Sequence, residues 1–229
     1  MERCIQHNDC DKCLEARNPY CGWCSLQKRC TIKSECHNAT NWGISERIIS
    51  SPRWLSLESK QCIDFQAIRP EYMPYNTVSN VELLIYQLPQ LPFGANYLCV
   101  FGNSSPIPAR VSRNGLSCMA PSIAVRPAIP SGVDHIAVSL AVRSSETDTD
   151  FIQRPFVFYD CTVHKTCKSC VTSSWACNWC MHENLCTHNT SSCARRVIVG
   201  ENVSLMILFN YCNRLFKLEI TWNPVNHII

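Results

Sequence analysis

The sequence predicts small disulfide-rich modules flanking an all-β, immunoglobulin-like sandwich, and three observations lead to this fold class. Cysteine supplies 18 of the 229 residues, far above its usual share, which requires either an oxidising compartment or many bound metals. Most of these cysteines recur in register toward the two ends of the chain. Between them lie short apolar runs separated by proline-rich turns, which is typical of a β-sandwich.

The cysteine repeat defines two copies of one module. Seven cysteines of the first copy recur in the second at offsets of 157, 157, 157, 156, 156, 156 and 157. A register kept over so many cysteines indicates a duplication, with a different domain between the copies. His7 and His164 share one slot, and Trp23 and Trp179 share another, where we expect each Trp to be the main apolar bulk of its module. The repeated cysteines are Cys4, Cys10, Cys13, Cys21, Cys24, Cys30 and Cys36 in the first copy, and Cys161, Cys167, Cys170, Cys177, Cys180, Cys186 and Cys193 in the second.

The segment 63–160 is predicted to form the sandwich. In "HIAVSLAV" at 135–142, apolar residues alternate with small or polar ones, the period of a half-buried strand. Other short apolar runs occur at 81–88, 97–101 and 155–159. Cys99 and Cys118 would then tie two strands of the sandwich together.

Charge and hydropathy exclude several classes of partner. The 21 basic and 18 acidic residues leave a net charge of +3 without long runs, which gives no reason to expect nucleic acid or contact with an anionic membrane. No signal peptide opens the chain, which suggests an internal fragment of a longer protein or an incomplete gene model. The longest apolar run, at 203–209, is shorter than the about 20 residues that span a bilayer. We therefore expect any membrane attachment to lie outside this sequence.

Zinc binding is one alternative explanation of the cysteines. Cys10, Cys13, Cys21 and Cys24 pair as Cys-x-x-Cys, as zinc thiolates do, and the second copy repeats the arrangement. The gap between the pairs is shorter than most zinc modules use, and three repeated cysteines of each copy stay unexplained. The repeated histidines could serve as ligands, although backbone hydrogen bonding in a turn is the more common role. The corresponding set in the second copy is Cys167, Cys170, Cys177 and Cys180.

A thiol-redox function is a second alternative. A redox Cys-x-x-Cys normally follows a buried strand and precedes a helix, but here it lies among other cysteines and beside Pro19. The sequence also offers no Ser/His/Asp or paired-carboxylate arrangement. We therefore expect no enzyme activity, no catalytic residue, no bound metal and no cofactor.

A disulfide lattice accounts for more of the sequence than either alternative. Eight cysteines within the first 62 residues can form four bridges, which replace a core too small to hold such a domain. Each bridge in a small secreted module typically contributes about 2–5 kcal/mol. Four Asn-x-Ser/Thr sequons fit the same extracellular compartment. The candidate glycosylation sites are Asn38, Asn103, Asn189 and Asn202.

These residues resemble a known family. "CIQHNDCDKCLEARNPYCGWC" at 4–24, with the cysteines after it, resembles the PSI domain shared by plexins, semaphorins and integrins. "YLCVFG", "LSCMAP" and "FVFYDC" resemble the IPT/TIG sandwich that separates PSI domains in plexins. The order PSI–IPT–PSI points to a plexin, with the B type as the candidate subtype, over about 200 residues.

The resemblance implies a disulfide pairing that spacing alone does not select. The second copy follows the pattern as far as Cys193, but Cys212 then follows after 18 residues, whereas 25 separate Cys36 from Cys62 in the first copy. The pairing Cys167–Cys212 is therefore left open. The other implied pairs are Cys4–Cys21, Cys10–Cys62, Cys13–Cys30 and Cys24–Cys36 in the first copy, and Cys161–Cys177, Cys170–Cys186 and Cys180–Cys193 in the second.

The expected domains are a PSI domain at 1–62, the sandwich at 63–160, a divergent second PSI domain at 161–203 and an atypical tail at 204–229. No Gly/Ser linker separates the modules, so they should be stiffly joined. The resemblance implies an extracellular stalk fragment of a semaphorin receptor at the plasma membrane. It would position a semaphorin-binding propeller, absent here, for transmembrane signalling in cell or axon guidance, with neighbouring receptor domains as its contacts. A secreted decoy isoform ending in the unusual tail is an alternative.

Overall fold

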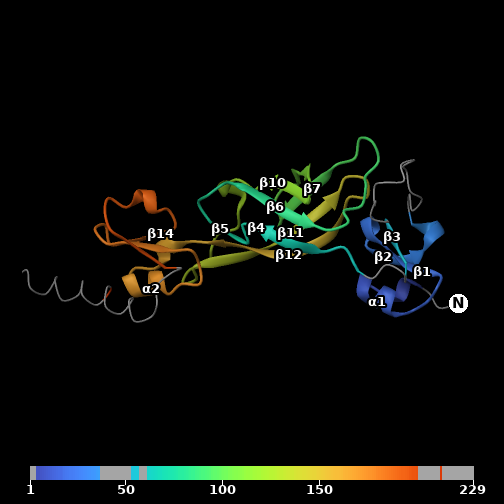
Figure 1. Cartoon of the computed structure of the whole chain (residues 1–229), viewed down its shortest axis with the longest axis horizontal. Helices are drawn as coiled ribbons and strands as arrows, with labels where there is room; N and C mark the ends of the chain where they lie inside the picture. The colour runs from blue at the N-terminus through green and yellow to red at the C-terminus, as the bar shows by residue number, and fades with distance from the viewer. Residues whose placement is uncertain (1–3, 37–52, 57–60, 201–211, 213–229) are drawn as a thin grey trace, which may run out of the picture. The chain divides into compact units, whose positions relative to one another are not determined.

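The fold follows from the computed structural model of the chain, which describes residues 4–36, 53–56, 61–200 and 212 (Figure 1). The structure divides into two units, and each is described by itself. The first unit contains the first cysteine-rich module and most of the sandwich. The second contains 74–76, 128–136 and the chain from 158 onward, so the division falls within strands β5, β11 and β12.

The first module is built around one short helix and a small antiparallel sheet. Helix α1 is capped by Asp9, whose Oδ1 accepts a hydrogen bond from the Lys12 backbone N–H at 2.8 Å. A helix this short is not stable alone, so bridges and packing must hold it. Trp23, Cys13 and Leu55 form its buried core with Cys21 and Cys30. The elements are η1 (Cys4–Gln6), α1 (Cys10–Glu15), β1 (Cys21–Cys24), η2 (Ser25–Gln27), β2 (Arg29–Ile32), η3 (Lys33–Glu35) and β3 (Trp54–Leu55), with sheet order β2-β1-β3.

The sandwich consists of two sheets, one of four strands and one of five. In β6, alternate residues are buried, which gives the sheet one core face. The run 135–142 is a strand, as expected, with Val138, Leu140 and Val142 buried. The first sheet has the order β4 (Phe65–Arg69), β6 (Asn80–Ile85), β10 (Gly115–Met119), β9 (Arg110–Ser112). The second has the order β5 (Tyr72–Pro74), β12 (Thr149–Tyr159), β11 (His135–Ser144), β7 (Tyr97–Phe101), β8 (Ile107–Pro108), and η4 (Ile123–Val125) lies in a connection.

The second module repeats the first in structure as well as in sequence. Its sheet has the order β14-β13-β15, so β15 takes the place that β3 has in the first module. Lys28 and Asn184, 156 residues apart, both adopt a left-handed conformation, with φ of 51° and 49°. Trp179 is buried here as Trp23 is in the first copy. The elements are η5 (Cys161–Val163), α2 (Cys167–Val171), β13 (Asn178–Cys180), β14 (Leu185–Thr187), η6 (Thr190–Ser192) and β15 (Val197–Val199).

Among the described residues, no helix is both long and apolar enough to cross a membrane. The tail expected at 204–229 lies outside these residues, apart from Cys212.

Candidate functional site

The disulfide lattice is the most extensive candidate feature. All eighteen cysteines lie within the described residues, and each belongs to one of nine disulfides. In the first module the two cysteines of "CGWC" bond in different directions: Cys21 to Cys4 and Cys24 to Cys36. The remaining bridges of that module are Cys10–Cys62 and Cys13–Cys30. These are the pairs that the plexin resemblance implies.

The second module has the equivalent bridges Cys161–Cys177, Cys170–Cys186 and Cys180–Cys193. The pairing that the sequence left open, Cys167–Cys212, is also present, so the changed spacing to the eighth cysteine is accommodated. Cys99 of β7 bonds to Cys118 of β10 and therefore links the two sheets of the sandwich.

This bonding differs from the arrangements that the zinc and redox alternatives require. The sulfurs of Cys161, Cys177 and Cys186 lie within 4.8 Å of one another, as metal ligands would. However, they belong to two adjacent disulfides, and a disulfide sulfur is not the thiolate that zinc binds. The members of both Cys-x-x-Cys zinc sets are likewise bonded to partners outside the expected tetrahedron, for example Cys21 to Cys4 and Cys180 to Cys193.

The lattice predicts a definite mass change. Reduction under denaturing conditions should add eighteen hydrogens, two for each of the nine disulfides, to the intact protein. Before reduction, iodoacetamide should label none of the cysteines, and native mass spectrometry should find no zinc. Alkylation of Cys10, Cys13, Cys21 and Cys24 in the unreduced protein, or stoichiometric zinc, would contradict the lattice.

A polar cluster within the first unit joins the first module to the sandwich. Arg53 Nη1 donates to Glu146 Oε1 at 2.8 Å, Nη2 also contacts Glu146 Oε2, and Nε donates to the Gln90 carbonyl at 2.9 Å. The side chains of Arg53 and Glu146 are only 12% and 11% exposed, so the ion pair is largely shielded from solvent. Burial raises the pKa of nearby Tyr97, with the Arg53 charge opposing and the Glu146 charge adding to this effect. Because two nitrogens of the Arg53 guanidinium contact the two oxygens of the Glu146 carboxylate, the pair fixes the relative orientation of these side chains as well as balancing their charges.

Backbone contacts extend this first junction. The Thr147 hydroxyl donates to the Leu26 carbonyl at 2.7 Å, across 121 residues of sequence. Within the module, the Ser25 N–H donates to the Arg53 carbonyl at 2.8 Å, which ties Arg53 to the same turn as Leu26. Leu26 of η2 and Arg53, just before β3, therefore both contact the turn between β11 and β12.

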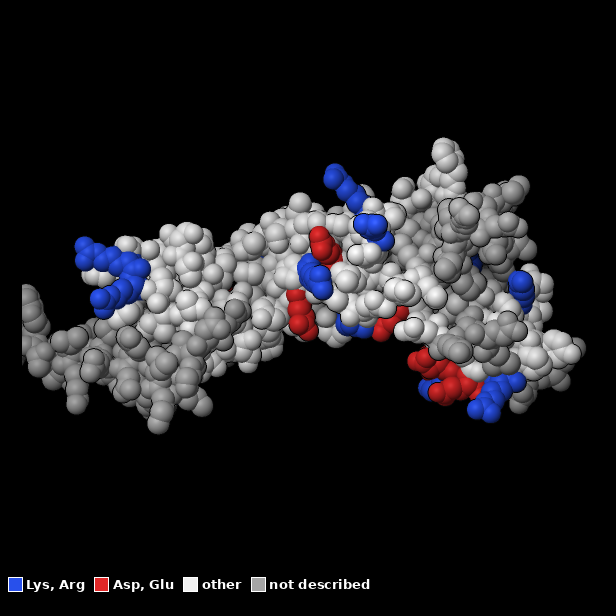
Figure 2. Space-filling model, viewed as in Figure 1, with Lys and Arg blue, Asp and Glu red and all other residues white. Residues whose placement is uncertain are grey.

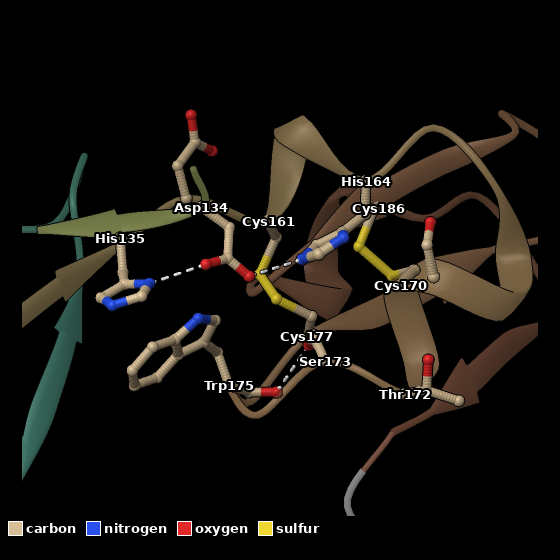
Figure 3. Close-up of polar contacts among 12 residues, drawn as sticks. Asp134, His135, Cys161, His164, Cys170, Thr172, Ser173, Trp175, Cys177 and Cys186 are labelled. Atoms are coloured by element: carbon tan, nitrogen blue, oxygen red, sulfur yellow. Dashed lines mark hydrogen bonds and ion pairs between the residues drawn. A yellow bond between two sulfur atoms is a disulfide. The ribbon is translucent and has the colours of Figure 1, made fainter. Parts of the chain in front are cut away.

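A second cluster, within the second unit, joins the sandwich end to the second module (Figure 3). Asp134 precedes β11, and its two carboxylate oxygens contact different histidines: Oδ1 lies 2.8 Å from His135 Nδ1, and Oδ2 lies 3.1 Å from His164 Nε2. Trp175 stacks on Tyr159 with ring centroids 5.6 Å apart and packs against His135 at 4.9 Å. One carboxylate and one indole thus hold residues of the sandwich to residues of the module.

The electrostatics of the second cluster favour an ionised Asp134. Burial raises the pKa of its carboxyl group, but hydrogen bonds from His135 and Trp175 and the charge of His164 outweigh burial and lower it below its ordinary value. Close by, burial lowers the pKa of His188, an effect that Asp160 partly opposes. The carboxylate is therefore held as an acceptor for the groups around it.

The structure assigns the repeated histidine slot a role that the sequence did not suggest. His164 ends η5 with a backbone hydrogen bond to Cys161, as its turn position led us to expect, but its ring also contacts Asp134. His7 makes the same backbone bond, to Cys4. No local signal could have identified Asp134, because it lies 30 residues upstream in a different module.

The remaining predicted positions are surface residues. Asn103 lies in an exposed turn, and Asn189 is exposed, with its Oδ1 accepting from the Ser191 N–H at 3.0 Å. Asn38 and Asn202 lie outside the described residues. On the face drawn in Figure 2, basic and acidic side chains are interspersed among broad uncharged areas, as the balanced composition predicts.

Family models match along most of the chain. A TIG domain model of the plexin type matches residues 69–159, a plexin repeat (PSI) model matches 3–51, and a plexin A/B PSI domain model matches 167–193. These are non-catalytic domains, which agrees with the expectation that the chain is not an enzyme.

Known plexins are similar over nearly the whole chain. Plexin A3 of Danio rerio is 35% identical over 197 residues, which is 85% of this chain and 10% of the relative. Human Plexin-A2 is 32% identical over 232 residues, covering 100% of this chain and 11% of the relative, and human Plexin-B1 is 32% identical over 209 residues, covering 89% and 9%. These identities favour the A type slightly over the B type that the sequence suggested.

A solved plexin structure is also similar to this chain. The full extracellular region of Plexin A4 matches with a TM-score of 0.69 and 32% identity, over 85% of this chain and 18% of that chain. This chain spans about a tenth of the length of the curated relatives it matches. With its matched domains, its disulfide framework and these relatives, the chain belongs to the plexin family and is a PSI–TIG–PSI segment of a plexin extracellular region.

Proposed function

We propose that this segment is part of the stalk of a semaphorin receptor on the outer face of the plasma membrane. Its role is to hold a ligand-binding propeller, located elsewhere in the receptor, and to transmit its rearrangement toward the membrane for signalling in cell or axon guidance. The partners are then semaphorin, through the propeller, and the adjacent receptor domains. Within the segment the working units are a PSI domain at 1–62, a TIG sandwich at 63–160 and a second PSI domain at 161–203.

The observation that carries this proposal is the closure of both junctions by side-chain contacts. The Arg53–Glu146 pair closes the first junction, and the Asp134–His164 contact with Trp175 closes the second. The stacking of Tyr159 on Trp175 spans only sixteen residues around a direct strand-to-module connection. A segment that served only as a tether would not require shielded polar contacts at each end of its sandwich.

The proposal also includes glycans at Asn103 and Asn189. Both side chains are exposed, and neither takes part in the two junctions. Glycans at these positions would cover surface without opening either module.

The proposal predicts that flexible junctions uncouple binding from signalling. In the full-length receptor, six Gly/Ser residues inserted between Cys62 and Ile63, or between Tyr159 and Asp160, should leave semaphorin affinity unchanged. The ligand-dependent intracellular response should fall severalfold, because the propeller movement is lost in the linker. The same insertion between Arg113 and Asn114, in the exposed turn between β9 and β10, is the matched control and should signal normally. Full signalling from both junction insertions would contradict the proposal.

A further inference from the structure

The second junction contains an unusual concentration of titratable groups around one carboxylate. Asp134 lies between His135 and His164, with one histidine on each oxygen (Figure 3). His135 belongs to β11 and His164 to the module, so protonation changes the charge on both sides of the contact. His164 is only 16% exposed, which shields its contact with Asp134 from screening by solvent.

The other charged groups near this cluster are committed to local contacts. Asp160 caps η5, with Oδ1 accepting from the Thr162 N–H at 2.9 Å and Oδ2 accepting from its hydroxyl at 2.9 Å. Lys165 Nζ donates to the Thr162 carbonyl at 2.7 Å. Burial lowers the pKa of His188, so this ring stays uncharged over more of the mildly acid range than an exposed histidine would.

We propose that the contact between the sandwich end and the second PSI module is pH-sensitive and becomes tighter between neutral and mildly acid solution through protonation of the two histidines on Asp134. This inference rests on the proposed function, since it adds a regulation to one of the junctions that the function requires.

The physical basis is the charge that protonation adds opposite the carboxylate. Asp134 is ionised, so a neutral His164 already gives it a hydrogen bond with a charged acceptor, whereas an imidazolium makes the same shielded contact an ion pair. Histidine is the side chain whose charge commonly changes between pH 5 and 8. A charged His135 would in addition face the Trp175 ring at 4.9 Å, an arrangement that cation–π attraction favours.

The ionisation of Asp134 sets the lower end of the pH range in which the junction is tight. Its pKa is lowered in the folded protein, so its contribution to stability is present above the unfolded value, near 3.8, and is lost as pH falls through the folded value. The carboxylate therefore stays charged in neutral and mildly acid solution. The junction should be tightest in mildly acid solution and weaken on either side of it.

The indole N–H of Trp175 provides a local reporter, because it belongs to the module and donates to Asp134. We would measure its solvent exchange by NMR on the whole chain at pH 7.5 and 5.5, corrected for the intrinsic exchange rate. We expect about a threefold to tenfold increase in protection at pH 5.5, because an ion pair then replaces the hydrogen bond between Asp134 and a neutral histidine.

Two variants isolate the cause. His164→Gln keeps a donor for Asp134 without a titratable charge, so protection at pH 7.5 should be retained and the rise at pH 5.5 should be lost. His182→Gln, at an exposed position of the same module, is the matched control and should behave as the wild type. Equal protection at both pH values in the wild type, or an unchanged rise in His164→Gln, would overturn the inference while leaving a closed junction intact. An indole unprotected at both pH values would instead contradict the proposed function.

Discussion

Replacing Gly22 by Asn, the residue at the equivalent position of the second module, should lower the free energy of unfolding by at least about 3 kcal/mol. A Cβ atom at Gly22 would meet the Trp54 indole and lie 2.5 Å from the Leu55 carbonyl oxygen, closer than real Cβ contacts come. The indole is fixed over this position, because its Nε1 donates to the Thr31 carbonyl at 3.2 Å, opposite Gly22 in the sheet. Moving either the indole or the backbone oxygen away to make room for a side chain would cost free energy of folding. Guanidinium unfolding followed by tryptophan fluorescence measures the loss.

The second module explains why Asn is accepted there. Val197 pairs with Cys180 as Trp54 pairs with Cys24, so no indole occupies the corresponding space above Asn178. Asn178→Gly is therefore the matched control and should cost no more than about 1 kcal/mol. Combining Gly22→Asn with Trp54→Val should recover part of the lost stability. An unfolding midpoint for Gly22→Asn equal to that of the wild type would show that the close packing at this glycine is not a real constraint.

This glycine also marks the limit of what the cysteine pattern could reveal. The repeat identified the modules because a disulfide framework requires its cysteines at fixed positions along the chain. The second copy has Asn178 where the first has Gly22, so the repeat shows no requirement for glycine at this position. In fact Trp54 packs so closely against Gly22 that no side chain fits there. Trp54 lies 32 residues away in the sequence and has no aromatic counterpart in the second copy. The spacing of the cysteines therefore indicates the disulfide framework, but it does not indicate which residues pack closely against one another.

The sandwich was predictable where burial is one-sided and less so elsewhere. In 135–142, alternation indicated the strand correctly, because Val138 and Leu140 are buried while Ala137 and Ser139 between and beside them are exposed. The run at 155–159 is only the end of β12, which begins at Thr149, because Gln153 and Arg154 separate that run from the buried Phe151 and Ile152 of the same strand. The run at 81–88 was too long, because β6 ends at Ile85 and the chain then turns through Gln87, which has a positive φ.

The junctions could not be predicted at all from the sequence. Arg53 and Glu146 are 93 residues apart, and neither lies in a motif. Asp134 precedes a strand, where a polar residue is ordinary and needs no explanation. Such contacts depend on how neighbouring modules are arranged, and a single sequence contains no local pattern from which that arrangement can be predicted. The absence of Gly/Ser linkers was the only indication, and it predicted stiffness without naming a residue.

Breaking the Arg53–Glu146 pair from one side should be the most damaging single change at the first junction. Glu146→Gln leaves the Arg53 guanidinium shielded from water with its charge no longer balanced by a carboxylate. We expect a loss of about 2–4 kcal/mol in the free energy of unfolding, because removing one partner of a buried pair costs more than the pair contributes. Chemical denaturation measures this loss, and hydrogen exchange at the Ser25 N–H, which donates to the Arg53 carbonyl, should show that the first module is the part released.

An exposed ion pair of the same turn provides the matched control. Arg143 Nη1 lies 3.3 Å from Asp148 Oδ1, but the Asp148 side chain is 83% exposed, so Asp148→Asn should cost less than about 1 kcal/mol. Asn also tolerates the positive φ of that position, so the backbone adds no penalty. The double variant Arg53→Met with Glu146→Leu should recover most of the stability lost in Glu146→Gln, since it removes both charges from the shielded site. If Glu146→Gln and Asp148→Asn cost the same, the Arg53–Glu146 pair is an ordinary surface contact, and the first junction must be held instead by the hydrogen bonds of Arg53 to the Gln90 carbonyl and of the Thr147 hydroxyl to the Leu26 carbonyl.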